Sequence, residues 1–298
     1  MDKKIVKLNG GLGNQMFQFA FAYVLAKKIN NAKILFDFSY FDESDNIAAQ
    51  IRNYELAAFD LGCKVAQEED LKLVNLSDSR TKVEKILGNI FKIKKFKSQK
   101  NIIRQASAYK FDKKYFSPEM YYYEGYFQNE KYFKNYKNDL IKCFSIKEEL
   151  DDKNLSTLKV IQSTESVSLH IRRGDYVTLQ CVNEFHGLCS LEYYEKAIDY
   201  IAQKVKSPHF FLFSDDIEWV VQNLKIDYPY TVVNFNKDKG WFDLNLMKHC
   251  KHNIIANSSF SWWAAWLNEN PDKIVIAPKQ WTLQKQKGYI APKEWVKL

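Results

Sequence analysis

The chain has 298 residues, of which 46% are hydrophobic, 15% aromatic and 27% charged, and its formal net charge is +8. This length suits one large or two medium domains, and the apolar content excludes an intrinsically disordered chain. The longest apolar run, Phe19–Ala26, is shorter than the roughly 18 residues that a membrane-spanning helix needs. Polar residues interrupt the segment after Lys3 and Lys4, so we expect no signal peptide.

The cysteines and lysines bear on where the protein works. Five cysteines, an odd number without a C-x-x-C pair, predict reduced thiols and a cytoplasmic protein. Between Arg80 and Lys114 lie ten lysines and two arginines against two acidic residues. A solvated helix face is the ordinary explanation, and contact with an anionic membrane or substrate is the alternative. Because no aromatic stacking module accompanies the lysines, we expect no nucleic-acid partner.

The N-terminal part opens with a strand–helix–strand pattern. Ile5–Leu8 is typical of a short strand, and a glycine-rich turn over 9–13 follows it. Apolar residues recur at helical spacing over Met16–Ile29, and Lys33–Phe38 predicts a second, parallel strand. From about 47 to 158 the pattern is irregular and rich in Lys and Tyr. Two short helical patterns lie in that part: Val83–Phe96 and Glu130–Cys143.

In the C-terminal part, apolar strands alternate regularly with helices. The predicted strands are Val167–Ile171, Phe210–Phe213, Thr231–Phe235, Asn253–Ala256 and Lys273–Ala277. The predicted helices are Leu191–Val205, Ile217–Leu224, Phe242–His249 and Phe260–Leu267. This alternation indicates an α/β protein with a parallel, doubly wound sheet, whose strands deliver their C-terminal residues to one crevice. We expect two domains, at 1–158 and 159–298.

Polar clusters follow three of these strands. They are His170-Ile171-Arg172-Arg173-Gly174-Asp175, Ser214-Asp215-Asp216 and Asn257-Ser258-Ser259-Phe260-Ser261. An arginine at the end of a buried strand needs a partner, and an ion pair with Asp175 is the structural explanation. The functional explanation is an anionic ligand, because a guanidinium can hold two phosphate oxygens at once.

The third cluster suits the same anionic ligand. Small hydroxyl residues such as Ser259 and Ser261 at a helix start expose backbone N–H groups, and the helix dipole favours negative charge there. N-capping alone is the simpler explanation, but together with Arg172 this turn predicts a diphosphate site. Three aspartates could accept hydrogen bonds from ribose hydroxyls or guanine N–H groups: Asp215, Asp216 and Asp243. Each aspartate by itself is more often an N-cap.

The glycine-rich turn has two explanations. Gly11 and Gly13 after a strand, with Asp37 ending the next strand, resemble half of a dinucleotide fingerprint and would suit a nicotinamide-dependent oxidoreductase. No third glycine follows, so the helix cannot pack as closely on the strand as in that fingerprint. A tight turn that exposes backbone and the amides of Asn14 and Gln15 to a ligand fits the residues better.

The sequence predicts no metal site. His249, Cys250 and His252 lie close together but lack further ligands at zinc spacing. No D-x-D triplet occurs, so the usual acidic clamp for a metal bound to a nucleotide diphosphate is missing.

Three segments resemble the hallmark motifs of one enzyme family. They are Gly10-Gly11-Leu12-Gly13-Asn14-Gln15-Met16-Phe17-Gln18, His170-Ile171-Arg172-Arg173-Gly174-Asp175-Tyr176-Val177 and Asn257-Ser258-Ser259-Phe260-Ser261-Trp262-Trp263-Ala264-Ala265. They are similar to bacterial α-1,2-fucosyltransferases of glycosyltransferase family 11. The similarity spans nearly the whole chain and includes the 125–128 segment and the regions of Trp281 and Trp295. H-x-R-R-x-D alone is shared with α-1,6- and protein O-fucosyltransferases, and the combination is more specific.

The resemblance implies a GT-B-type architecture of two Rossmann-like domains whose parallel sheets face each other across a cleft. It implies transfer of L-fucose from GDP-β-L-fucose to the 2-hydroxyl of a terminal galactose, with inversion and without an essential metal or other cofactor. The expected setting is synthesis of bacterial surface glycans (O-antigen or lipooligosaccharide, including blood group H-type structures) in the cytoplasm. Peripheral attachment to the inner face of the cytoplasmic membrane is the alternative to a freely cytoplasmic enzyme.

The resemblance also implies roles for individual residues. Arg172 would hold the donor diphosphate, and His170 and Asp243 would contact guanine. The remaining residues expected to bind the donor are Ser259, Phe260 and Ser261 at the phosphates and Gly13 and Asn14 facing the fucose. Asp175 is the candidate general base, with orientation of an arginine as its alternative role. Acceptor specificity is expected in the N-terminal domain, the acceptor side, and in the loop Val182–Leu188.

Overall fold

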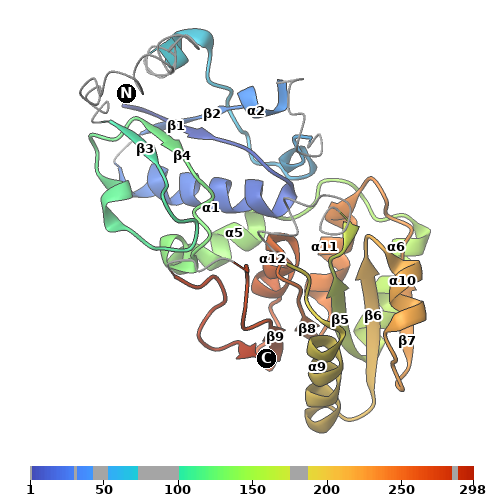
Figure 1. Cartoon of the computed structure of the whole chain (residues 1–298). Coiled ribbons are helices and arrows are strands. Elements are labelled where there is room, and N and C mark those ends of the chain that lie inside the picture. The colour runs from blue at the N-terminus through green and yellow to red at the C-terminus, as the bar shows by residue number, and fades with distance from the viewer. Residues whose placement is uncertain (1, 30–31, 43–52, 73–100, 175–186, 284–287) are drawn as a thin grey trace, which may run out of the picture.

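The computed structural model describes residues 2–29, 32–42, 53–72, 101–174, 187–283 and 288–298. Its strands form two separate sheets, each with helices packed on it, and both sheets are parallel in every pairing (Figure 1). This confirms the α/β fold class with two parallel sheets. The predicted division at residue 158 falls inside helix α6, Asp152–Ser163, and the domain limits stay a prediction.

The N-terminal sheet has the strand order β2-β1-β4-β3. Its strands are β1 Lys3–Lys7, β2 Lys33–Asp37, β3 Ile102–Arg104 and β4 Tyr122–Glu124. Helix α1, Leu12–Lys28, buries twelve of its 17 residues. A helix this apolar on most sides must be covered on more than one face, and α1 accordingly packs against β1 and β2 as well as against helix α12, Ser259–Leu267.

The C-terminal sheet has the strand order β10-β9-β8-β5-β6-β7. Its strands are β5 Glu165–Ile171, β6 Pro208–Ser214, β7 Tyr230–Val233, β8 His252–Ile254, β9 Val275–Ala277 and β10 Val296–Lys297. Alternate residues of β6 enter two different cores, as the two-residue period of a strand requires. Helices α9, Leu191–Lys204, and α10, Ile217–Asn223, cover one face, and α11, Gly240–His249, lies with α6 and α12 on the other.

An aromatic core joins the two halves at the contact between α1 and α12 (Figure 1). Phe17 of α1 lies 4.5 Å from Trp262 and 4.9 Å from Trp263, measured between ring centroids. The Trp263 indole N–H also donates to the Gly13 carbonyl at 3.0 Å. Both tryptophans are fully buried. This contact fixes the start of α12 beside the turn that precedes α1.

The middle of the chain departs from the sequence-based prediction. A single helix over Glu130–Cys143 is wrong: this stretch forms two short 3₁₀ turns and then a two-turn helix. The chain leaves helical geometry at Phe133 (φ −139°, ψ −3°), whose buried ring stacks on Trp263. The short elements of this half are α2 Ser39–Asp42, η1 Leu56–Ala58, η2 Lys113–Phe116, η3 Glu130–Tyr132, η4 Lys134–Tyr136 and α5 Lys137–Cys143.

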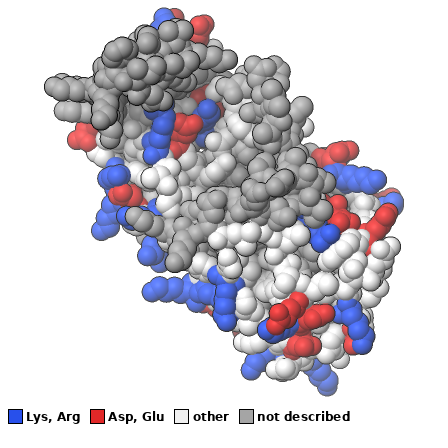
Figure 2. All heavy atoms as spheres, in the orientation of Figure 1, with Lys and Arg blue, Asp and Glu red and all other residues white. Residues whose placement is uncertain are grey.

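Most of the lysine-rich segment, residues 80–100, lies outside the described residues, as does the predicted helix Val83–Phe96. On the face shown in Figure 2, basic and acidic side chains of the described residues are intermixed over the C-terminal half. None of the helices in the described ranges is long and apolar enough to cross a membrane. Contact of the lysine-rich segment with a membrane stays a prediction.

Candidate active site

The ends of β5 and β6 bring Arg172 and Asp215 together. Arg172 Nη1 lies 2.5 Å from Asp215 Oδ2, and the two side chains are 23% and 26% exposed. The other oxygen of Asp215 accepts the Arg173 backbone N–H at 2.8 Å. A Cβ added to Gly174 would lie 2.5 Å from Asp215 Oδ2, so a larger residue there would push this carboxylate from its place. The carboxylate therefore holds the guanidinium in place at the edge of the sheet; Asp175, the partner considered from the sequence, lies outside the described residues.

Arg173 is directed to a different place from Arg172. Its guanidinium carbon lies 3.4 Å from the centre of the Trp219 ring, and its Nε lies 3.0 Å from Asp216 Oδ2. Asp216 also caps α10, because its Oδ1 accepts the Trp219 backbone N–H at 3.4 Å. Asp216 thus has the capping role named above as its alternative, and its predicted role in donor binding stays a prediction.

His170, near the end of β5, carries an unused hydrogen-bonding atom. The side chain is only 6% exposed, and Nδ1 finds no partner among the described residues. Burial lowers the pKa of His170 to about 4, so the imidazole is neutral at pH 7 and offers one donor and one acceptor. Its ring lies 5.6 Å from that of Phe260 at the start of α12. A buried, unpaired ring nitrogen at this edge suits a ligand with polar ring edges.

The start of α12 lies between the two halves. No side chain caps the helix at Ser258 among the described residues, so its first backbone N–H groups remain suited to an anion. Gly13 lies directly against this turn: an added Cβ would come within 2.5 Å of the Phe260 nitrogen and the Ser259 carbonyl carbon. Ser261 is fully buried, and its hydroxyl donates to the Ser258 carbonyl at 3.3 Å. The backbone contacts around Gly13 leave no room for a side chain, so glycine is required where α1 meets α12.

Asn14 and Gln15 behave differently. Asn14 is half-buried, and its Oδ1 accepts from the Gln128 side-chain amide at 2.8 Å. Gln15 is fully buried: its amide donates to the carbonyls of Gly10 and Asn53, and its oxygen accepts the Glu55 N–H at 2.9 Å. The expectation that Gln15 presents its amide to a ligand is wrong, because these backbone groups use it to tie α1 to the following segment.

Asp243, in the first turn of α11, is a partly buried carboxylate. Burial raises the pKa of Asp243 to about 6, although a hydrogen bond from Asn236 Nδ2 to Oδ1 at 2.8 Å favours the charged form. Asn236 in turn exchanges amide hydrogen bonds with the buried Asn154 of α6, at 2.8 and 2.9 Å. Asn236 thus orients Asp243 and is itself held by Asn154. The sequence pattern did not indicate this arrangement, because 82 residues separate Asn154 from Asn236.

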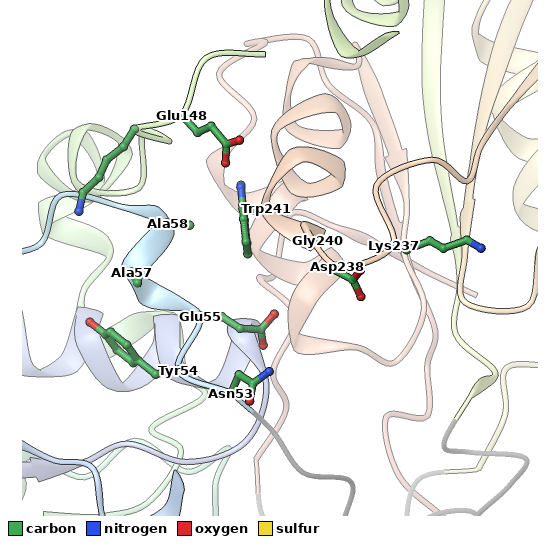
Figure 3. A pocket seen from close by; sticks show the side chains of 11 residues that line it. Asn53, Tyr54, Glu55, Ala57, Ala58, Glu148, Lys237, Asp238, Gly240 and Trp241 are labelled. Atoms are coloured by element: carbon green, nitrogen blue, oxygen red, sulfur yellow. The ribbon is translucent and has the colours of Figure 1, made fainter. Parts of the chain in front are cut away.

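A pocket of about 570 Å³ lies between the halves, beside the start of α11 (Figure 3). Its N-terminal wall comes from residues 53–55, 57, 58, 147 and 148, and its C-terminal wall from residues 237, 238, 240 and 241. Figure 3 shows Glu55 and Trp241 reaching into the same space from opposite halves. Sequence reasoning missed both residues, because neither lies in a recognisable motif.

Two other features of the sequence have structural partners. His249 Nδ1 lies 2.6 Å from the Asn245 carbonyl, and His252 Nδ1 accepts the Ile274 N–H at 3.0 Å. Asp37, the candidate ribose-binding acid of the oxidoreductase interpretation, is 4% exposed and accepts from the Tyr122 hydroxyl at 2.6 Å. These groups hold strands and helix ends together.

Comparisons with known proteins agree on one family. The model of glycosyl transferase family 11 matches residues 68–298. The chain is 33% identical to the O-antigen biosynthesis glycosyltransferase WbnK of Escherichia coli, over 98% of this chain and 99% of that one. It is 32% identical to an α-1,2-colitosyltransferase of Escherichia coli, over 99% and 98%. Galactoside α-(1,2)-fucosyltransferase 1 of Rattus norvegicus is 31% identical over 34% of this chain and 27% of its own.

The family match covers most of the chain, and two relatives are similar over its whole length. The family excludes the oxidoreductase interpretation of the glycine-rich turn. The protein is a glycosyltransferase and belongs to glycosyl transferase family 11.

Proposed function

We propose that the protein transfers L-fucose from GDP-β-L-fucose to the 2-hydroxyl of a terminal galactose, with inversion and without an essential metal ion. The observation that carries this proposal is the place of the start of α12 beside the end of β5: the Phe260 ring lies 5.6 Å from the ring of His170, two residues before Arg172, which Asp215 holds. The names of the rat fucosyltransferase and of WbnK support the acceptor linkage and a role in O-antigen synthesis.

The mechanism follows from where charge develops. As the bond between fucosyl C1 and the diphosphate oxygen breaks, negative charge builds on GDP, and the galactose 2-oxygen forms the new bond from the opposite face. Arg172 and the α12 N–H groups stabilise that charge, and because Asp215 already holds the guanidinium, little reorganisation is needed. The leaving diphosphate needs no proton, whereas the acceptor hydroxyl must lose one to a base.

Asp175 is the proposed base. Its replacement by asparagine separates the two roles considered for it. If Asp175 accepts the proton, Asp175→Asn lowers kcat at saturating acceptor and leaves the Kd for GDP unchanged. Weakened GDP binding with a matching loss of activity would instead assign Asp175 to orienting an arginine.

The guanine base is proposed to lie near His170 and Asp243. His170 Nδ1, which has no partner within the part of the chain that the structure describes, can exchange a hydrogen bond with the ring edge. Asp243 can accept from guanine N–H groups when it is ionised, which its pKa of about 6 permits at pH 7. The hydrogen bond from Asn236 leaves the second carboxylate oxygen in a fixed direction.

Colitose is a second candidate for the transferred sugar, because the colitosyltransferase is as similar to this chain as WbnK is. Colitose lacks the 3-hydroxyl of fucose, so the two donors differ by one polar group. Incubating the enzyme with GDP-fucose or GDP-colitose and a panel of β-galactosides, with and without a chelator, decides between them. We expect an α-linked fucosyl product whose anomeric form, seen by NMR, is inverted and whose rate the chelator does not change. Transfer from GDP-colitose alone, or from neither donor, would overturn the proposal.

A further inference from the structure

Tyr126 is an exposed aromatic residue at the carboxyl edge of the N-terminal sheet. It follows β4, which pairs in parallel with β1, so the two strands end at the same edge. Parallel α/β sheets bind their ligands outside the carboxyl ends of the strands. The Tyr126 side chain is 39% exposed, and a large aromatic ring left exposed at such an edge is available to a ligand.

A strained turn holds Tyr126 in this position. The next residue, Phe127, has a φ of +50°, in the left-handed region that disfavours residues other than glycine. The Phe127 ring is fully buried and stacks on Phe21, with 4.0 Å between ring centroids. The backbone N–H groups of Tyr126 and Phe127 both donate to Gln105 Oε1, at 3.0 and 2.9 Å. The core and one side chain therefore maintain the strain, and strain of this kind is concentrated at functional sites.

Two hydrogen bonds attach the turn to helix α1. Gln18 Nε2 donates to the Gly125 carbonyl at 3.1 Å. Gln128 Nε2 donates to Asn14 Oδ1 at 2.8 Å. Because Asn14 uses its oxygen for this contact, its NH₂ group faces away from Gln128. Gly13, the neighbour of Asn14, lies against the start of α12, where the diphosphate is proposed to bind. The turn is thus bonded directly to a residue that is expected to face the transferred sugar.

Tyr126 lies in a hollow of the surface rather than on a protrusion. Although the side chain is exposed, burial by the surrounding atoms raises the pKa of Tyr126, and the nearby Tyr40 phenol adds to this rise. Tyr40 belongs to α2, which follows β2 at the same edge of the sheet. An aromatic ring in a hollow suits a ligand that has an apolar face and several hydroxyl groups.

We propose that the Tyr126 ring is the surface on which the acceptor galactose lies. A β-galactose ring carries its axial 4-hydroxyl on one face and mainly C–H groups on the other, and the C–H face fits a flat aromatic ring. The equatorial 2-hydroxyl then stays at the rim of the sugar, where it can attack fucosyl C1. This inference rests on the proposed function and names the residue that binds the acceptor in the same site.

Tyr126→Leu tests the inference, because leucine keeps an apolar side chain and removes the flat ring. With galactosyl-β1,3-N-acetylglucosamine and galactosyl-β1,4-N-acetylglucosamine as acceptors, we expect the acceptor KM to rise about five- to tenfold, as for loss of one aromatic contact. Tyr126→Phe keeps the ring, so its acceptor KM should stay within about twofold of wild type. Neither variant should change the Kd for GDP. Tyr230→Leu is the matched control, because Tyr230 of β7 is 45% exposed and lies on the other sheet.

Three results would overturn the inference: an unchanged acceptor KM in Tyr126→Leu, a rise in Tyr126→Phe as large as in Tyr126→Leu, or an equal rise in Tyr230→Leu. Melting temperatures of all variants exclude a loss of folding as the cause. If the wild-type enzyme transfers no fucose, the proposed function fails, and binding alone still tests the role of Tyr126. Saturation-transfer NMR of the two disaccharides then compares wild type with Tyr126→Leu. A signal that is lost in the variant supports the inference, and equal or absent signals refute it.

Discussion

Replacing Arg172 by alanine tests the charge-stabilising site directly. One donor that acts where charge develops typically contributes about 2.7–4 kcal/mol to barrier lowering, or 10²–10³ in rate. The structure adds a second effect: without Arg172, the carboxylate of Asp215 is no longer balanced and would repel the diphosphate. We therefore expect Arg172→Ala to lower kcat/KM by about 10³ or more.

The double variant separates these two effects. Arg172→Ala with Asp215→Asn removes the uncompensated charge, so it should recover part of the activity lost in Arg172→Ala alone. Arg172→Lys keeps the charge without the planar fork and should lie between wild type and Arg172→Ala. The measurements are steady-state release of GDP and the Kd for GDP by calorimetry.

Loss of folding must not account for the result. The pair is partly exposed, and Asp215 keeps its hydrogen bond from the Arg173 N–H, so the free energy of unfolding should fall by only on the order of 1 kcal/mol. If Arg172→Ala kept half of the wild-type rate while GDP bound normally, Arg172 would not act on the diphosphate.

Three further predictions concern packing and pH. Gly13→Ala should lower the free energy of unfolding by about 1–3 kcal/mol, because the added Cβ would lie 2.5 Å from the α12 backbone. Denaturant unfolding measures this loss. Gly240→Ala is the control and should be nearly neutral, because the nearest atom to its Cβ would be 3.7 Å away. Burial raises the pKa of Asp243 to about 6, so the folded protein protonates this carboxylate as pH falls through about 6. GDP affinity should drop over the same range, because the neutral acid is a poorer acceptor. The stability of Asp243→Asn relative to wild type should be higher at pH 7, where wild type buries a charge, than at pH 4.5. His170 has the opposite sign: its pKa of about 4 makes folding lose stability as pH falls from 6.5 to 4, and His170→Gln should lack this loss. Equal pH profiles of wild type and variant would refute either assignment.

The C-terminal sheet could be predicted from the sequence because its strands are apolar and separated by clear helices. Val167–Ile171 and Phe210–Phe213 were expected and lie within β5 and β6. The strands β3 and β4 were not expected, because each has three residues and gains its order from pairing with β1 or with each other. Short strands of this kind carry too little periodic pattern to be recognised alone.

Local sequence determined which chemical groups reach the crevice: an arginine pair after one strand and a serine-rich helix start after another. Tertiary structure alone decided their partners. Arg172 pairs with Asp215, 43 residues away, whereas the guanidinium of Arg173 lies over the Trp219 ring. The Gln15 amide forms hydrogen bonds with backbone groups instead of facing a ligand. Spacing along the chain fixes the order of residues on a strand or helix, but ion pairs and buried hydrogen bonds form between elements that meet only when the sheets pack.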